Sequence, residues 1–258
     1  MPGAVTVAAD TNAFVFSGPG GIGGALTFTK AGTNVLTVSV TNSYAGSTFI
    51  SNGTVVVAAD AGFGLSAVTL EAGVALVRAG AAGTLGTGAV WVATNATLAL
   101  NAFPAANAVT LEGGTLAING AVSYTQQVTL VGGLTNTLRM AGNYALLKGA
   151  LTGTGDVLVT GTGVPGLMLT NSGNSFLGRV QIANTTFLRL IGEETLPDTA
   201  VVEVQAGGNL RLDGGGLTET LAGLSGAGAV WIPTSSDDHA LRIGAGDVRR
   251  PSTAPWAR

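Results

Sequence analysis

A glycine-rich stretch near the start of the chain has the form of a phosphate-binding loop. Gly18, Gly20 and Gly23 follow the apolar residues 14–16 and precede a second apolar segment. Such a loop binds phosphate when it joins a strand to a helix, because backbone N–H groups and the helix dipole both favour a negative charge there. The first hypothesis is therefore a nucleotide-binding enzyme.

The residues around this loop do not support a nucleotide site. Residues 25–40 are β-branched and interrupted by glycine, so no helix is expected to follow the loop. The acidic residue that would bind a ribose about 20 positions further on is missing, since Asp60 is the next one after Asp10. The loop and the pair Tyr144 and Lys148 loosely resemble the short-chain dehydrogenases, but the loop is one residue short of that family's Gly-x-x-x-Gly-x-Gly pattern. We therefore expect no cofactor.

Acidic residues occur in two short groups that could serve acid–base or metal chemistry. The groups are Glu193–Glu194 and Asp237–Asp238–His239, which contains the single histidine of the chain. A polysaccharide lyase or hydrolase built on a β-helix needs such groups clustered on one face. Adjacent residues of a strand point to opposite faces, so residues 237–239 are expected to form a solvated loop. We expect no catalytic residue and no metal site, and a carbohydrate-active enzyme stays the alternative.

Two tryptophans are candidates for contact with a partner. Trp91 and Trp231 each stand between two apolar residues, at the position that points outward in a half-buried strand. An outward aromatic ring can stack on a sugar or on a neighbouring chain, or it can pack against a loop of its own chain. The partners left open are a host or glycan ligand, and self-association end to end or side by side.

The composition excludes several other functions. The 258 residues carry a net charge of −3, and the 11 basic residues are scattered singly except at Arg249–Arg250, so we expect no nucleic-acid binding. The absence of cysteine excludes disulfides and thiolate metal sites. The chain has no uninterrupted apolar run of about 18 residues, so no transmembrane helix is expected. The first residues lack the basic and apolar regions of a signal peptide.

Apolar residues recur along the chain at a nearly constant spacing. Pairs that flank one variable position occur at Val68/Leu70, Val90/Val92, Val109/Leu111 and Val128/Leu130, which are separated by steps of about 20 residues. The same pattern returns at Val202/Val204 and Val230/Ile232, and the interval between Val128 and Val202 has room for three or four more units, with Val157/Val159 and Val180/Ile182 as candidates. This alternation is typical of strands with one buried face, and glycine in the intervening segments allows tight turns.

The constant step predicts an all-β solenoid. Each unit of about 19–22 residues would form one coil, and equivalent strands would stack, which also accounts for a charged fraction of only 10%. A sandwich or antiparallel barrel would instead place strands about 8–12 residues apart in hairpins. We expect roughly 13 coils, with an entry or cap segment at 1–23, the solenoid at 24–246 and a polar tail at 247–258.

A longer repeat is superimposed on the coils. Residues 42–57 and 174–189 align without a gap at an offset of 132, and each copy follows a Gly-x-Leu segment that starts near residue 24 or residue 149. The repeat residues are Gly24, Leu26, Lys30, Gly32, Asn42, Tyr44, Gly46, Thr48, Ile50, Gly53 and Thr54, and then Asn174, Phe176, Gly178, Ile182 and Thr186. The second copy departs from the first where Val180 replaces Thr48 and Thr185 replaces Gly53.

This spaced pattern resembles the passenger-associated repeat of bacterial autotransporters. The resemblance implies a right-handed parallel β-helix on the surface of a Gram-negative cell, with repeats that aid folding and secretion. The chain is expected to be part of a longer precursor, with a stand-alone relative as the alternative. It also implies that the repeat residues hold the fold and touch no ligand. The expected function is a non-enzymatic stalk or adhesin-like passenger segment, with a self-assembling surface fibre as a second alternative. Membrane attachment is expected only through a C-terminal barrel that this chain does not contain.

Overall fold

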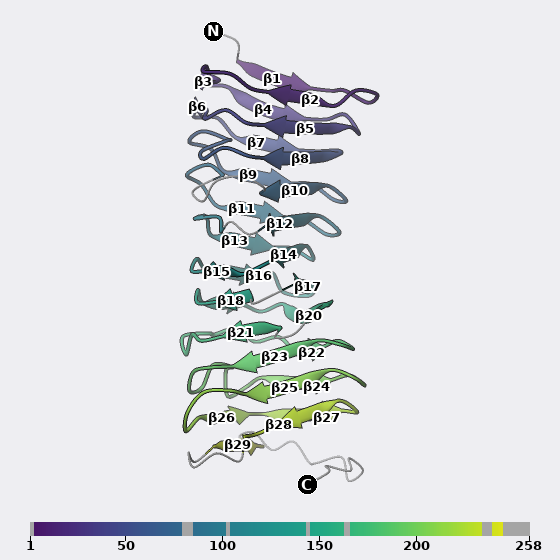
Figure 1. Cartoon of the computed structure of the whole chain (residues 1–258), viewed down its shortest axis with the longest axis vertical. Coiled ribbons are helices and arrows are strands. Elements are labelled where there is room, and N and C mark those ends of the chain that lie inside the picture. The colour runs from purple at the N-terminus through teal and green to yellow at the C-terminus, as the bar shows by residue number, and fades with distance from the viewer. Residues whose placement is uncertain are drawn as a thin grey trace.

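The computed structural model describes residues 3–78, 85–101, 104–142, 145–162, 166–233 and 239–244. The described residues form a single stack of short strands, with the N-terminus at one end and the C-terminus at the other (Figure 1). Every element among them is a strand, so none of these segments is a helix that could cross a membrane. The all-β prediction is confirmed.

Three sheets run along the stack, with two short ones beside them. The eight-stranded sheet contains β1 (Ala4–Val7), β4 (Thr27–Lys30), β7 (Thr48–Ile50), β9 (Val68–Leu70), β11 (Val90–Val92), β13 (Val109–Leu111), β16 (Val128–Leu130) and β19 (Leu151–Gly153). The eleven-stranded sheet contains β2 (Phe14–Phe16), β5 (Val35–Val38), β8 (Thr54–Val57), β10 (Ala75–Arg78), β12 (Thr97–Asn101), β14 (Thr115–Asn119), β17 (Thr135–Ala141), β20 (Asp156–Thr162), β22 (Val180–Ile182), β24 (Val201–Val204) and β27 (Gly223–Gly226). The six-stranded sheet contains β15 (Val122–Tyr124), β18 (Ala145–Leu147), β21 (Leu167–Leu169), β23 (Phe187–Leu190), β25 (Asn209–Leu212) and β28 (Ala229–Trp231). The two-stranded sheets are β3 (Gly23–Gly24) with β6 (Ser43–Tyr44), and β26 (Thr218–Leu221) with β29 (Ala240–Ile243).

Strand order along the chain shows how the sheets surround the core. The eleven-stranded sheet extends over nearly the whole stack, whereas the eight-stranded sheet ends at β19 and the six-stranded sheet begins at β15. In the middle turns the chain passes through all three, as in β15, β16 and β17. β26 comes between the six-stranded and eleven-stranded sheets, the place that β16 holds earlier. The solenoid thus has three sides. The eleven-stranded sheet forms one side nearly throughout, whereas the other long sheet is the eight-stranded one in the first half and the six-stranded one in the second half.

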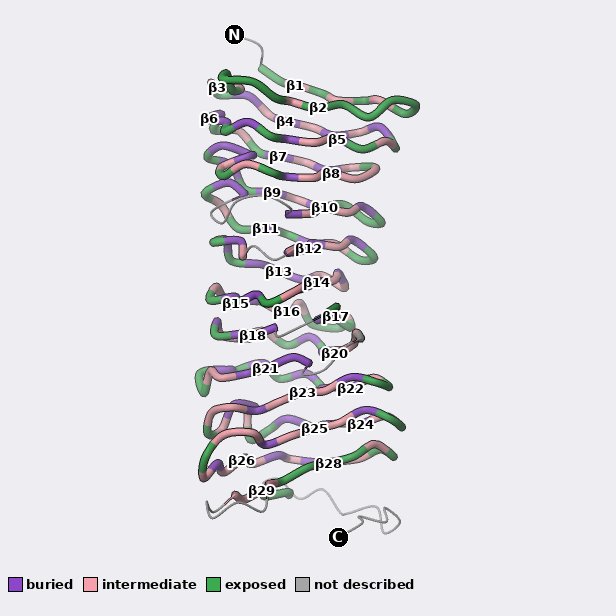
Figure 2. The backbone as a smooth tube through the Cα atoms, viewed as in Figure 1, coloured by how far each residue is buried: buried purple, intermediate pink, exposed green. Residues whose placement is uncertain are grey.

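Successive turns pair in parallel and in register, which aligns apolar side chains into ladders. Val68, Val90, Val109 and Val128 lie in one such row, and all four are buried. Figure 2 shows buried and more exposed residues alternating along the strands. Because inward residues recur every second position, each strand contributes one face to a continuous core. Each fully buried aliphatic side chain contributes about 1.5–3 kcal/mol relative to exposure.

The predicted turn length is close to the observed one, but pairs with the same pattern do not all lie on one side of the solenoid. The step is not constant, since it is shorter from Leu98 to Leu116 than from Val128 to Leu151. The first four predicted pairs do stack in the eight-stranded sheet. The pairs at Val157, Val180 and Val202 lie in the eleven-stranded sheet, and Val230 lies in the six-stranded sheet. Variation in turn length moves equal-looking pairs onto different sides.

The number of turns is also smaller than the sequence estimate. The longest sheet has 11 strands instead of the roughly 13 expected, because most of its steps take about 22 residues. β1 and β2, which lie in the segment expected to be an entry or cap, pair with β4 and β5 and extend the two sheets. The expected tail at 247–258 lies outside the described residues.

The corners between strands repeatedly need a left-handed backbone. Gly53 has φ +74°, Gly133 has φ +75° and Asn95 has φ +61°. Thr185, which stands where the first repeat has Gly53, has φ +59°. Glycine adopts this conformation without penalty, whereas a residue with a Cβ is disfavoured there, a β-branched one most of all. The second repeat therefore keeps the left-handed turn, and the backbone of Thr185 is strained.

We predict that Thr185→Gly stabilises the protein. The Thr185 side chain is exposed, so its loss removes little contact, while relief of the left-handed strain of about 1–2 kcal/mol outweighs the extra chain entropy of glycine. The free energy of unfolding measured by urea denaturation should rise by about 1 kcal/mol. Gly133→Thr is the matched control, because no atom lies within 4 Å of an added Cβ, and it should be destabilising. A decrease in stability of Thr185→Gly would contradict the assignment of strain.

Candidate functional site

The asparagine of each repeat connects three consecutive turns. Asn42 accepts a hydrogen bond from Ile22 N at 2.7 Å on one side and donates to Gly62 O at 2.6 Å on the other. Asn174 does the same, accepting from Leu151 N and donating to Thr195 O, both at 2.7 Å. Both side chains are buried. A buried amide satisfies backbone groups that the corner leaves without sheet partners, so these residues are structural clamps.

The aromatic residue two positions later fills the interior of the corner. Tyr44 and Phe176 are both fully buried. The Tyr44 hydroxyl lies 2.6 Å from Thr48 Oγ1, which lies 2.8 Å from Ser66 Oγ, and Ser66 donates to Phe63 O at 2.8 Å. Burial raises the pKa of Tyr44 to about 12, so the hydroxyl stays protonated. The three hydroxyls thus form a hydrogen-bonded chain that ends at a backbone carbonyl inside the core.

This hydroxyl chain explains why the second repeat differs from the first. Where Tyr44 has Thr48 as its partner, Phe176 has Val180 at the same spacing. Phe176 carries no hydroxyl, so an oxygen at position 180 would have no such partner, and a buried hydroxyl without a hydrogen bond is costly. The two exchanges together preserve a satisfied core.

The remaining repeat residues also act inside the stack. A Cβ added to Gly46 would lie 2.0 Å from Leu26 O, and one added to Gly178 would lie 2.0 Å from Gly155 O, so only glycine fits against the preceding turn. Lys30 is buried and donates from Nζ to the carbonyl oxygens of Gly32 and Asn52. Burial lowers the pKa of Lys30, and the charge of Asp10 partly opposes this shift.

The two repeats do not lie on the same side of the solenoid. The first one leads through Gly46 into β7 of the eight-stranded sheet, and the second leads through Gly178 into β22 of the eleven-stranded sheet. From β8, which follows β7, the eleven-stranded sheet reaches β22 in six steps. The repeat therefore occurs at corners that lead into two different sheets, and its two copies do not form one composite site.

Glu219 is a buried carboxylate that bonds to Thr195, the residue to which Asn174 donates. The sequence did not lead us to predict it. Glu219 of β26 accepts from Thr195 N at 2.9 Å, from Thr195 Oγ1 at 3.1 Å and from Leu196 N at 2.7 Å. Burial raises the pKa of Glu219 to about 7; the hydrogen bonds from Leu196 and Thr195 oppose the shift and the charge of Glu194 adds to it. The signal was present, because Glu219 lies two residues before the inward Leu221 and must share its face.

Among the residues considered for catalysis, Glu194 and His239 lie in the described part of the chain and bond to groups of the fold. The Glu194 carboxylate accepts hydrogen bonds from Thr220 N and Thr220 Oγ1, both at 2.9 Å. His239 Nδ1 accepts from Leu217 N at 3.3 Å. Asp237, Asp238 and Tyr144 lie outside the described residues. No group of three or more His, Cys, Asp or Glu that could hold a metal ion occurs in the part of the chain that the structure describes.

The two tryptophans are exposed but lie on different sheets. Trp91, 41% exposed, belongs to β11 of the eight-stranded sheet and donates from Nε1 to Glu112 Oε2 at 2.8 Å. Trp231, 45% exposed, belongs to β28 of the six-stranded sheet, and the guanidinium of Arg211 stacks 4.2 Å from its ring centroid. They therefore cannot share one ligand surface on a single sheet.

We predict strong coupling between Tyr44 and Thr48. Thr48→Val alone should lower the free energy of unfolding by about 1–3 kcal/mol, because it leaves the buried Tyr44 hydroxyl without its partner. The double variant Tyr44→Phe with Thr48→Val copies Phe176 and Val180, and it should cost less than Thr48→Val. Urea denaturation of both single variants and the double variant measures the coupling, and additive effects would contradict the interpretation.

The Glu219 carboxyl should make stability depend on pH. Its pKa is raised in the folded state, so its contribution is fully present below about pH 4.5 and is lost as the pH rises to about 7, a total of about 3 kcal/mol. Thermal unfolding from pH 4 to pH 8 should show this decline, and Glu219→Gln should remove it. Glu71→Gln on an exposed corner is the control. Parallel pH curves for the protein and Glu219→Gln would show that the carboxyl does not titrate in this range.

Comparison with known proteins gives one family match. Residues 28–57 match the sequence model of the family described as the passenger-associated-transport-repeat, a segment that includes Asn42, Tyr44 and Gly46. No curated protein matches the chain, and no solved structure matches it. The matched segment supplies β4, β5, β6, β7 and β8, and it includes the corner clamp described above. Residues 28–57 are therefore similar to the passenger-associated-transport-repeat, and in this chain they form part of a β-solenoid.

Proposed function

We propose that this chain is a non-enzymatic β-helical stalk or adhesin-like segment of a secreted or cell-surface passenger. It belongs to a longer precursor, and its transport repeats support the folding of the solenoid during secretion. The observation that carries this proposal is the use of the repeat's polar groups. Asn42, Thr48 and Lys30 are buried and bonded to the chain itself, so the motif is occupied in holding turns together.

The stacked fold suits a protein that crosses a membrane as an extended chain. Each strand pairs with strands one turn away, so an existing stack can add a turn whenever about 20 more residues become available. No long-range partner must be present before the stack can grow. The chain has no cysteine, so this growth does not depend on disulfide formation. A corner clamp such as Asn42, which joins three turns, supports this growth where sheet hydrogen bonds are interrupted.

Surface display of the chain tests the role of the repeat. The chain is placed between a signal peptide and an autotransporter translocator in a Gram-negative host, and the displayed fraction is measured by protease accessibility. Asn42→Ala leaves Ile22 N and Gly62 O without this partner and should cost about 2–4 kcal/mol. We expect it to reduce display more than Leu98→Ala, a core substitution expected to cost about 2–5 kcal/mol.

The comparison is made between variants whose measured losses of stability agree. Equal reductions in display by Asn42→Ala and Leu98→Ala would contradict a secretion role of the repeat. Incubation of the purified chain with neutral and acidic polysaccharides tests the non-enzymatic part. Release of new reducing ends or of unsaturated products would overturn it.

A further inference from the structure

The outer surface of the six-stranded sheet carries a row of cationic and aromatic side chains. Parallel register places Arg189, Arg211 and Trp231 in line on three successive strands, β23, β25 and β28, and the preceding position of this row is the buried Met168 of β21. Their neighbours along the strands, such as Leu188 and Leu210, point into the core. Arg189 and Arg211 therefore project outward, one turn apart in the sequence and side by side in the structure.

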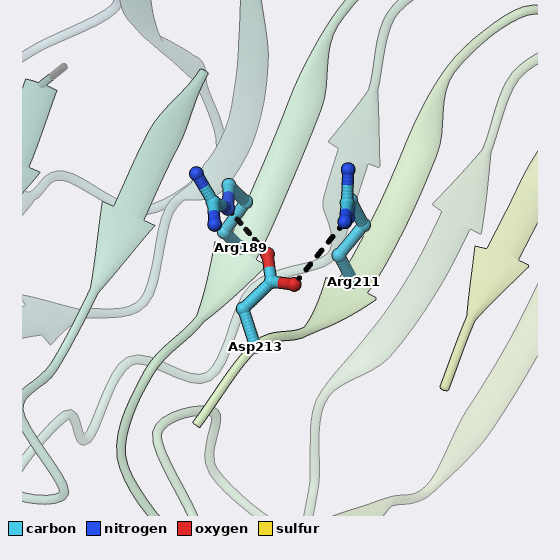
Figure 3. Close-up of polar contacts among 3 residues, drawn as sticks. All are labelled: Arg189, Arg211 and Asp213. Carbon is cyan, nitrogen blue, oxygen red and sulfur yellow. Dashed lines mark hydrogen bonds and ion pairs between the residues drawn. The ribbon is translucent and has the colours of Figure 1, made fainter. Parts of the chain in front are cut away.

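One carboxylate binds both arginines and leaves an excess of positive charge. Asp213, directly after β25, accepts from Arg189 Nε through Oδ2 and lies 3.3 Å from Arg211 Nη2 through Oδ1 (Figure 3). The Asp213 side chain is only 6% exposed, whereas Arg189 and Arg211 are 21% and 28% exposed. Two guanidinium groups and one carboxylate leave one net positive charge, held in a fixed orientation.

Hydrogen-bond donors of this cluster are left over for a ligand. Among the described residues, neither the two Nη groups of Arg189 nor Nη1 of Arg211 has a hydrogen-bond partner. Arg211 Nε is buried without a partner in the same part of the chain, and Trp231 stacks on its guanidinium. A guanidinium presents its N–H groups as a planar fork that matches a carboxylate.

Trp231 adds an apolar surface beside these donors. Its indole is 45% exposed although Arg211 stacks on it. An exposed aromatic ring next to oriented polar groups can pack against the apolar face of a sugar ring while the polar groups bind its substituents. Trp91 has a different setting, because its row contains Thr69 and Thr110 and its Nε1 donates to the anionic Glu112.

We propose that Arg189, Arg211 and Trp231 form a binding site for a uronic acid residue of an acidic polysaccharide. The carboxylate of the sugar binds the free donors of the two arginines, and the sugar ring packs on Trp231. Asp213 positions both arginines and touches no ligand. This inference rests on the proposed function only for its adhesive part, since it names the ligand of an exposed passenger surface.

Binding is measured by isothermal titration calorimetry with a galacturonic acid oligomer and with the neutral galactose oligomer of the same length and linkage. We expect saturable binding of the acidic oligomer alone, and weaker binding at higher salt. Arg189→Gln and Arg211→Gln should each weaken binding about 10-fold or more, since a charge-assisted hydrogen bond is lost. Either variant leaves Asp213 with one arginine, so the fold should persist, which circular dichroism checks.

Trp231→Ala tests the sugar-stacking part, and Trp91→Ala is its matched control with similar exposure on another sheet. We expect several-fold weaker binding for Trp231→Ala and no change for Trp91→Ala. No binding of the acidic oligomer, equal binding of the neutral oligomer, or equal losses for both tryptophan variants would overturn the proposal. Inorganic sulfate that competes as well as the oligomer would also overturn it, because the site would then bind an anion without its sugar.

These outcomes are distinct from a failure of the proposed function. Absence of glycan binding removes this site and leaves the repeat and its effect on display untouched. Turnover of the bound oligomer would contradict the non-enzymatic function while leaving the binding site in place.

Discussion

The structure depends on parallel hydrogen bonding between one turn and the next. Each turn must bring its strand back beside the preceding one at a separation of about 4.8 Å, with inward residues over inward residues. The length of the step differs from turn to turn, yet Leu98 still pairs with Leu116 and Val128 with Leu151. The corners therefore absorb the differences in length. This makes the corners the positions where residue type is most restricted.

The two copies of the longer repeat show that a corner needs a set of compatible residues and not a fixed sequence. Asn42 and Asn174 make equivalent bonds to the turns on either side. Tyr44 requires an oxygen partner and has Thr48, whereas Phe176 requires none and has Val180. The same set lies before strands of two different sheets. Its role is thus local, which agrees with a function in stacking turns and would be unexpected for a ligand site assembled at one place.

The all-β solenoid could be predicted from the sequence, because it follows from local patterns. Alternation gives strands, and a regular step of one coil length gives parallel stacking. The side on which each strand lies could not be predicted, since small differences in turn length accumulate and the three sides have similar composition. Val128 and Val202 show the same pattern in the sequence, although the two lie on different sheets. The roles of Glu219 and Asp213 were missed for the same reason, as their partners Leu196 and Arg189 lie a full turn away in the sequence.

A solenoid separates the residues that hold it together from those that can vary. Inward positions and corners are fixed by packing and by backbone hydrogen bonds, but the outward position of each strand has no such constraint. In-register pairing then brings outward residues of successive turns into one line, as with Arg189 and Arg211. Two single substitutions one turn apart can thus create adjacent groups without a change in the core. The low charged fraction, 10%, sharpens this effect, because a charged row stands out on a surface composed mainly of Thr, Asn, Gly and Ala. Asp213 forms ion pairs with both Arg189 and Arg211, so charged side chains of neighbouring turns meet at this point.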